Sequence, residues 1–205
     1  TGNPAPTYQW EVSTNAGGSW AKVTTGTGGT SPSYTTPPTS LTQSGRLYRV
    51  IVKNGIGSPV TSNPATLTVQ TRPVITTQPV NQTVMSPATA AFSVAVSGVP
   101  TPTCQWQVSS NGTTWTNVSS DGTATTYTTD PTSLSDNGKR FRCILTGAGS
   151  PVVSATATLT VKEAPFITVQ PTNGTAIAPA VTTFKVVTTG NPAPTYQWEV
   201  STNAG

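Results

Sequence analysis

The sequence is poor in charged groups and contains no histidine. Its 205 residues include 10 Lys and Arg, 6 Asp and Glu, and two cysteines. Without histidine the chain lacks the commonest general base and metal ligand, and two cysteines do not make a tetrahedral zinc site. No pair of carboxylates stands at positions typical of acid–base catalysis, and no glycine-rich phosphate loop opens a helix. The sequence therefore predicts a protein that is not an enzyme, with no metal site and no cofactor.

Long apolar runs are also missing. No stretch approaches the roughly 20 apolar residues that span a bilayer, so we expect no membrane span in this segment. The net charge of +4 comes from a shortage of acids. The basic residues are dispersed, apart from Arg46 with Arg49 and the run Lys139, Arg140 and Arg142. We interpret these as solvated strand residues rather than a polyanion-binding stripe, and expect no nucleic-acid partner.

The residues that are abundant favour β-structure. Threonine dominates the composition, with valine, serine, 18 glycines and 19 prolines. Threonine and valine are β-branched and suit a pleated surface, while glycine and proline mark turns. No segment keeps a helical period. The composition therefore predicts an all-β fold.

Internal repetition is the strongest pattern in the chain. The motif around Trp10 returns around Trp106 and again around Trp198, at spacings of 96 and 92 residues. Residues 1–17 recur letter for letter at 189–205, whereas the middle copy differs, with Cys104 in place of Tyr8. The repeating unit is therefore a pair of alternating domains.

The repeats divide the chain into three parts. Residues 1–71 correspond to the back of a domain (strands C to G), 72–162 to a complete domain, and 163–205 to the front (strands A to C) of a further domain that repeats the start of the chain. A half-sandwich exposes its core and a strand edge. The missing halves are therefore expected either from continuation of the chain beyond both ends or from a neighbouring subunit.

Spaced core residues suggest a family. Phe92-x-Val94-x-Val96-x-Gly98 is followed by Trp106 and then by Asn137-Gly138-x-x-Phe141-x-Cys143. With these residues the chain resembles the bacterial immunoglobulin-like (I-set-like) tandem repeats of large extracellular and surface proteins. The resemblance implies tandem β-sandwiches that form an elongated rod. It also implies strands A at 74–77, B at 89–97, C at 103–109, C′ at 114–118, E at 125–129, F at 139–146 and G at 151–161.

The resemblance assigns roles to several side chains. It implies that Trp10, Trp106 and Trp198 are core anchors. It places Cys104 and Cys143 on neighbouring strands C and F, where they form either a cross-strand disulfide or two buried free thiols. Trp20 and Trp115 either pack inward or stack on a ligand, and the outward Ile51 and Ile144 are either lateral contacts or isolated exposed residues.

The expected function is structural. We predict an extracellular or cell-surface filament or stalk built of repeated domains, with other copies of the chain as partners. One alternative is a cell-surface adhesin or carbohydrate-binding array whose partner is a surface polymer or glycan. Another is an accessory domain of a secreted enzyme, which requires a catalytic region outside this sequence.

Overall fold

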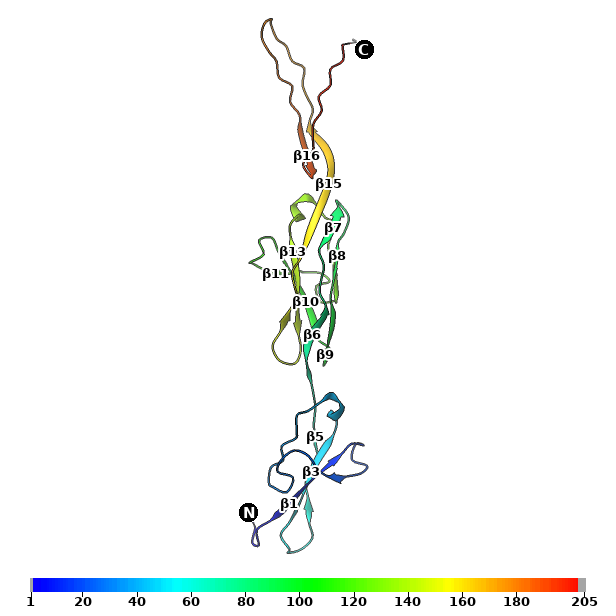
Figure 1. Cartoon of the computed structure of the whole chain (residues 1–205), viewed down its shortest axis with the longest axis vertical. Coiled ribbons are helices and arrows are strands. Elements are labelled where there is room, and N and C mark those ends of the chain that lie inside the picture. Colours follow the sequence, from blue (N-terminus) through cyan, green and yellow to red (C-terminus); the bar gives the residue numbers. More distant parts are fainter. Residues whose placement is uncertain (1, 203–205) are drawn as a thin grey trace. The chain divides into compact units, whose positions relative to one another are not determined.

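The computed structural model describes residues 2–202, and nearly all of its regular structure is β-strand (Figure 1). Two 3-10 turns, η1 (Leu41–Gln43) and η2 (Leu134–Asp136), are the helical elements of the described residues. The chain divides into two compact units. The first extends to Arg72 and the second begins at Pro73, with the loops 98–101 and 147–149 grouped with the first. The all-β prediction is confirmed.

The first unit contains one antiparallel sheet. Its central strands, β1 (Thr7–Ser13) and β3 (Leu47–Lys53), pair along their whole length, which places Trp10 opposite Val50. Short strands extend the sheet on both sides: β2 (Ala21–Lys22), β4 (Val60–Thr61) and β5 (Ala65–Thr66). Within the described residues of this unit, no second sheet packs against the face that carries Trp10. The first unit is therefore one layer of a sandwich.

The second unit contains both layers. One layer is formed around long central strands, in the order β11 (Thr116–Asn117), β10 (Thr103–Ser109), β13 (Arg140–Thr146) and β15 (Ala157–Val169). Two short strands join it, β14 (Val152–Val153) beside β13 and β7 (Gln82–Met85) parallel to β15. The facing layer consists of two pairs, β8 (Ala91–Ser93) with β12 (Thr126–Thr128) and β6 (Thr71–Thr77) with β9 (Ala95–Val99).

The core of the complete domain follows from strand alternation. On β10 and β13 every second side chain points between the layers, because successive residues of a strand face opposite sides of the sheet. The largest side chains between the layers are essentially inaccessible to solvent: Trp106 of β10 is 0% exposed, Phe141 of β13 3%, and Phe92 of the facing strand β8 0%. Phe92 and Phe141 stack with ring centroids 4.5 Å apart. Burying each such aromatic ring contributes roughly 1.5–3 kcal/mol.

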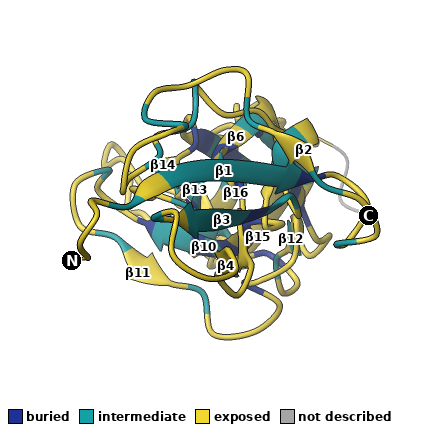
Figure 2. Cartoon of the chain, turned by 90° about the horizontal axis from the view of Figure 1, so that it is seen from below, coloured by how far each residue is buried: buried dark blue, intermediate teal, exposed yellow. Residues whose placement is uncertain are grey.

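The first unit buries its corresponding residues less completely. Tyr48, which takes the place of Phe141, is 9% exposed, while Trp10 and Tyr34 are only half-buried. Figure 2 shows β1 largely in the colour of intermediate burial. A single layer with its loops thus covers only part of its apolar face.

Strand β15 crosses the expected boundary at residue 162. Its first five residues alternate into the core, with Ala157 and Val161 both 0% exposed. Beyond Lys162 the same strand continues, pairs with β16 (Val187–Asn191) and exposes 66% of Phe166. Because the strand is continuous, the expected third part, 163–205, is grouped with the complete domain in one unit.

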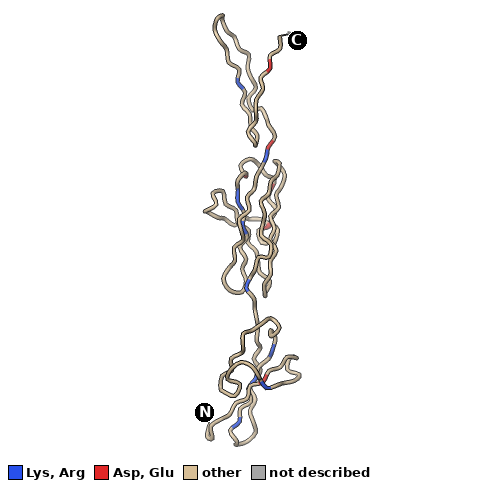
Figure 3. The backbone as a smooth tube through the Cα atoms, viewed as in Figure 1, with Lys and Arg blue, Asp and Glu red and all other residues tan. Residues whose placement is uncertain are grey.

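Charged side chains are sparse along the backbone of both units (Figure 3). Two ion pairs are present among the described residues, Arg49 with Glu11 and Lys139 with Asp136. None of the described helical elements is long and apolar enough to cross a membrane.

Candidate functional site

The same arginine–tryptophan stack occurs in both units, on the outer face of the sheet. The Arg49 guanidinium lies 4.0 Å from the centroid of the Trp20 ring, and that of Arg142 lies 4.1 Å from the centroid of the Trp115 ring. Both tryptophans are half-buried and lie outside the core cluster. Cation–π contacts of this kind contribute about 0.5–1 kcal/mol at exposed sites. Each indole is therefore covered by an arginine rather than packed inward.

The residue beside the arginine differs between the two units. In the first, Glu11 lies opposite Arg49 in the ladder. Its carboxylate accepts a hydrogen bond of 2.9 Å from Nε of Arg49 and forms an ion pair of 2.8 Å with Nη2. In the complete domain Gln107 lies opposite Arg142 and accepts one bond of 2.9 Å through its side-chain oxygen. The geometry is kept while the negative charge is lost. The sequence predicted the alternation but not this contact, because the pairing depends on strand register.

The three repeated tryptophans, expected to be core anchors, lie in different surroundings. Trp106 is fully buried and its indole N–H donates to the Ala124 carbonyl at 2.9 Å. The Trp10 indole N–H donates to Ser31 at 3.0 Å, and the ring is half-buried. Trp198, expected to be a core anchor, is 52% exposed. It differs because the described residues of this chain place no second layer over it.

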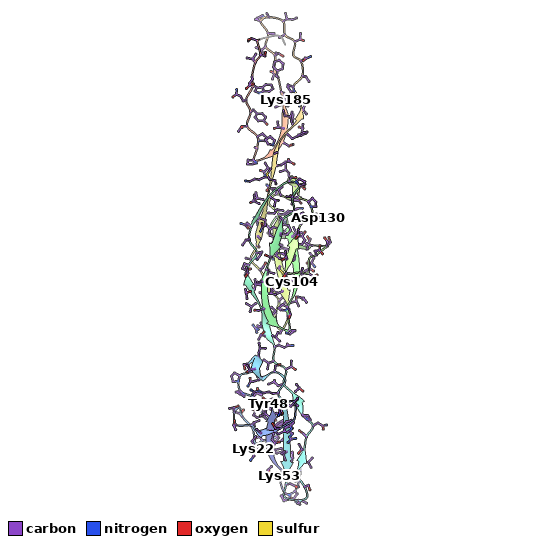
Figure 4. All side chains as sticks on the ribbon, turned by 90° about the vertical axis from the view of Figure 1, so that its right-hand side faces the viewer. Lys22, Tyr48, Lys53, Cys104, Asp130 and Lys185 are labelled. Carbon is purple, nitrogen blue, oxygen red and sulfur yellow. The ribbon has the colours of Figure 1, made fainter. Side chains whose placement is uncertain are left out.

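The two cysteines are free thiols and both are buried, Cys104 at 5% and Cys143 at 0% exposure. They lie on paired strands, but Cys104 is opposite Leu145 and Cys143 is opposite Trp106. The two cysteines are therefore diagonal neighbours in the ladder, and their thiols interact with each other. The implied disulfide stays a prediction. Burial, followed by the neighbouring Cys104 thiol, raises the pKa of Cys143 to about 12. Figure 4 labels Cys104 in the complete domain.

The outward isoleucines lie on the same face as the stacks. Ile51 is opposite Gln9 and Ile144 is opposite Gln105, and both isoleucines are half-buried. Their role as lateral contacts between copies stays a prediction.

The carboxylates of the complete domain serve local structure. Asp136 accepts hydrogen bonds from Lys139 at 2.6 Å and from the Ser133 amide at 2.8 Å, and these bonds lower its pKa below the usual value. The bond from the Ser133 amide is part of the capping box of η2. Over residues 2–202, no group of three His, Cys, Asp or Glu side chains is placed to hold a metal ion.

The glutamine-to-glutamate exchange on β10 tests the stack. We expect Gln107→Glu to stabilise the complete domain by about 0.5 kcal/mol, because it restores the partly screened ion pair of the first unit. The gain is expected to vanish in 1 M salt, where the Debye length is about 3 Å. Calorimetric unfolding measures both effects. The matched control, Glu11→Gln, has the opposite sign in the first unit, and a salt-independent gain contradicts the explanation.

Thiol counting tests the cysteine pair. In the reduced protein at pH 8 we expect no reaction with an aromatic disulfide reagent, because the thiolate is the nucleophile and burial keeps Cys143 protonated. Denaturation is expected to release two thiols. Reaction in the native fold contradicts the burial. Counting thiols in denatured protein that was prepared without reductant tests the implied disulfide. If the disulfide is present, no free thiol is left to react.

Two curated proteins contain segments similar to this chain. Endoglucanase C of Cellulomonas fimi is 39% identical over 138 residues, covering 67% of this chain and 12% of that protein. Roundabout homolog 2 of Homo sapiens is 29% identical over 155 residues, covering 75% of this chain and 11% of that protein. The chain therefore spans about an eighth of the length of these relatives.

The chain also resembles a protein of known structure and matches a family model. A structure of three Ig domains of titin matches with a TM-score of 0.57 at 17% identity, over 80% of this chain and 58% of that one. This likeness shows the fold, and tandem immunoglobulin-like domains are confirmed. The family model described as a domain of unknown function, DUF8696, matches twice, at residues 1–71 and 75–163. The chain belongs to this family.

Proposed function

We propose that this chain is a non-catalytic structural segment of an extracellular filament or stalk built from repeated immunoglobulin-like domains. In this role the domains act as spacers that separate the two ends of the array and carry tensile force. Their partners are other copies of the same sequence. The observation that supports the proposal most directly is the continuity of β15 between two successive sheets.

The hydrogen bonding of β15 explains why continuity matters. Leu159 to Lys162 pair in parallel with β7, so Lys162 lies opposite Met85. The next residue, Glu163, already lies opposite Asn191 of β16. No unpaired linker separates the two ladders. A pull along the chain therefore loads the β7–β15 hydrogen bonds in shear, so that several of them share the force and do not open one at a time.

A second candidate rests on the similarity to a segment of Endoglucanase C. In this reading the array is an accessory part of a longer secreted protein that acts on a glucan. The Arg142–Trp115 stack supplies an aromatic ring and a guanidinium on one exposed sheet face. Such a surface suits a sugar ring, which offers both C–H and hydroxyl groups.

Single-molecule pulling tests the structural proposal. We expect the complete domain to unfold in one step that releases about 30 nm, for roughly 90 residues at about 3.4 Å each. Ser86→Pro removes the amide that donates to the Lys162 carbonyl at the end of the β7–β15 ladder and is expected to lower the peak force by roughly half. Ser86→Ala keeps the amide donor and serves as the control. Unfolding without a force peak, or an unchanged peak in Ser86→Pro, contradicts the proposal.

Co-sedimentation with insoluble cellulose tests the second candidate. If the chain binds glucan through the stack, the bound fraction exceeds that of an unrelated immunoglobulin domain. It is then expected to fall several-fold in Trp115→Ala, since an aromatic contact is worth about 0.5–1.5 kcal/mol beyond the area that it buries. The control is Val153→Ala, at an exposed position on β14. If cellulose retains no more of this chain than of the unrelated domain, the glucan-binding proposal is excluded and the structural proposal remains.

A further inference from the structure

The arginine–tryptophan stack of the first unit is closed, because its ring N–H and its positive charge both have acceptors within that unit. The indole N–H of Trp20 donates to the Gly17 carbonyl at 3.1 Å. Nε of Arg49 donates to the Glu11 carboxylate at 2.9 Å, and Nη2 forms an ion pair with the same carboxylate. The stack of the first unit is therefore satisfied internally.

The corresponding stack of the complete domain is open at its indole. Three residues separate Asn111 from Trp115, whereas four separate Asn15 from Trp20. The Trp115 ring contacts Arg142, but no group in the part of the chain that the structure describes accepts a hydrogen bond from its indole N–H. The ring is half-buried. The stack of the complete domain thus retains an unused donor on its aromatic side.

The arginine of this stack is open as well. Nε of Arg142 donates to the Gln107 side chain at 2.9 Å, and Gln107 in turn donates to Oδ1 of Asn117 at 2.9 Å. These bonds run in one direction across β13, β10 and β11, so the groups left over at the two ends are donors. They are Nη1 and Nη2 of Arg142 and Nδ2 of Asn117. Neither ion pair of the described residues involves Arg142, so its charge is uncompensated.

A second unpaired arginine lies on the same face. Arg140 and Arg142 are two positions apart on β13, so they point to the same side of the sheet with Cα atoms about 7 Å apart. Arg140 is exposed, and its guanidinium lies against Gly112 in the loop before Trp115. The first unit has Leu47 at the position of Arg140. The donor cluster of the complete domain therefore consists of Trp115, Asn117, Arg140 and Arg142.

The composition of the donor cluster defines the chemistry of its ligand. The cluster carries two positive charges, its unused hydrogen-bonding groups are donors, and an aromatic ring lies among them. A planar carboxylate accepts two parallel hydrogen bonds from a guanidinium, and the two Nη groups of Arg142 are free for this contact. The Trp115 indole combines an apolar ring with an N–H, which suits the C–H groups and oxygens of a sugar. Because a carboxylate alone does not require the ring, the cluster fits a carboxylated sugar better than an acidic peptide.

We propose that the donor cluster binds an acidic polysaccharide, with a uronate carboxylate on Arg142 and the sugar ring against Trp115. Arg140 holds a second carboxylate of the same polymer. The two arginines are then binding groups and not only solvated strand residues. The proposal goes beyond both candidate functions, because the structural function needs no ligand and cellulose carries no carboxylate. The pulling and cellulose experiments therefore do not decide it.

Calorimetric titration of the whole chain with polygalacturonate is the first test, with fully methyl-esterified polygalacturonate as the uncharged ligand. We expect binding of the acid and none of the ester. Gln107→Glu supplies the carboxylate that Arg142 lacks and is expected to weaken binding about tenfold, the usual weight of a charge-assisted hydrogen bond. Since this exchange is expected to stabilise the domain, unfolding does not explain a loss. Lys185→Gln changes the net charge equally at an exposed position labelled in Figure 4, and is expected to bind normally.

Three results overturn the proposal. The first is no binding of polygalacturonate at physiological ionic strength. The second is an equal loss in Gln107→Glu and Lys185→Gln, which reduces the effect to net charge. The third is equal affinity for poly-L-glutamate or single-stranded DNA, which present negative charge without a carboxylated sugar.

The unused indole N–H is tested by a matched pair of substitutions. Trp115→Phe keeps an aromatic ring beside Arg142 but removes the free donor, and it is expected to weaken polygalacturonate binding several-fold. Trp20→Phe is the control and is expected to bind normally, because the N–H that it removes is already bonded to Gly17. Equal affinities of the two variants overturn the assignment of the indole to the site.

Discussion

The packing of four aromatic rings between two layers is the constraint on which the rest of the structure depends. Phe92 comes from the front of the domain, while Trp106, Tyr127 and Phe141 come from the back. Neither group is covered without the other, so a domain becomes stable only when both parts of the repeat meet. The interior is close-packed, and leaving out one such ring removes contacts that the remaining side chains do not replace.

This constraint also explains the behaviour of β15. Its alternation buries Leu159 and Val161 because the complete domain supplies a facing layer there. The same alternation after Lys162 leaves Phe166 and Ile167 exposed, although the strand remains paired. Hydrogen bonding along a ladder is therefore satisfied locally, whereas burial depends on what lies across the sandwich. The strand therefore runs from a buried core into a segment whose apolar side chains are exposed.

Much of the fold could be predicted from the sequence, because it depends on local alternation and on repetition. The expected strand at 103–109 coincides with β10. The expected strand at 89–97 is instead divided at Val94, since β8 pairs with β12 and β9 pairs with β6. The strand β7 was missed because Gln82–Met85 has little apolar pattern and is fixed by parallel pairing with β15. The arginine stacks likewise depend on which residues the register brings together, and spacing alone does not reveal this.

The alternation of core residues has a consequence for how such a chain folds. The complete domain has Cys104 and Cys143 in its core, where the first unit has Tyr8 and Val50. Repeat proteins misfold characteristically when equivalent elements of neighbouring domains exchange places. Because domains with these two kinds of core alternate, segments of identical sequence are separated by a complete domain whose core residues differ. When the front layer of the complete domain is synthesised, the back layer made before it, in residues 1–71, is therefore of the other core type, and its own back layer follows next in the chain.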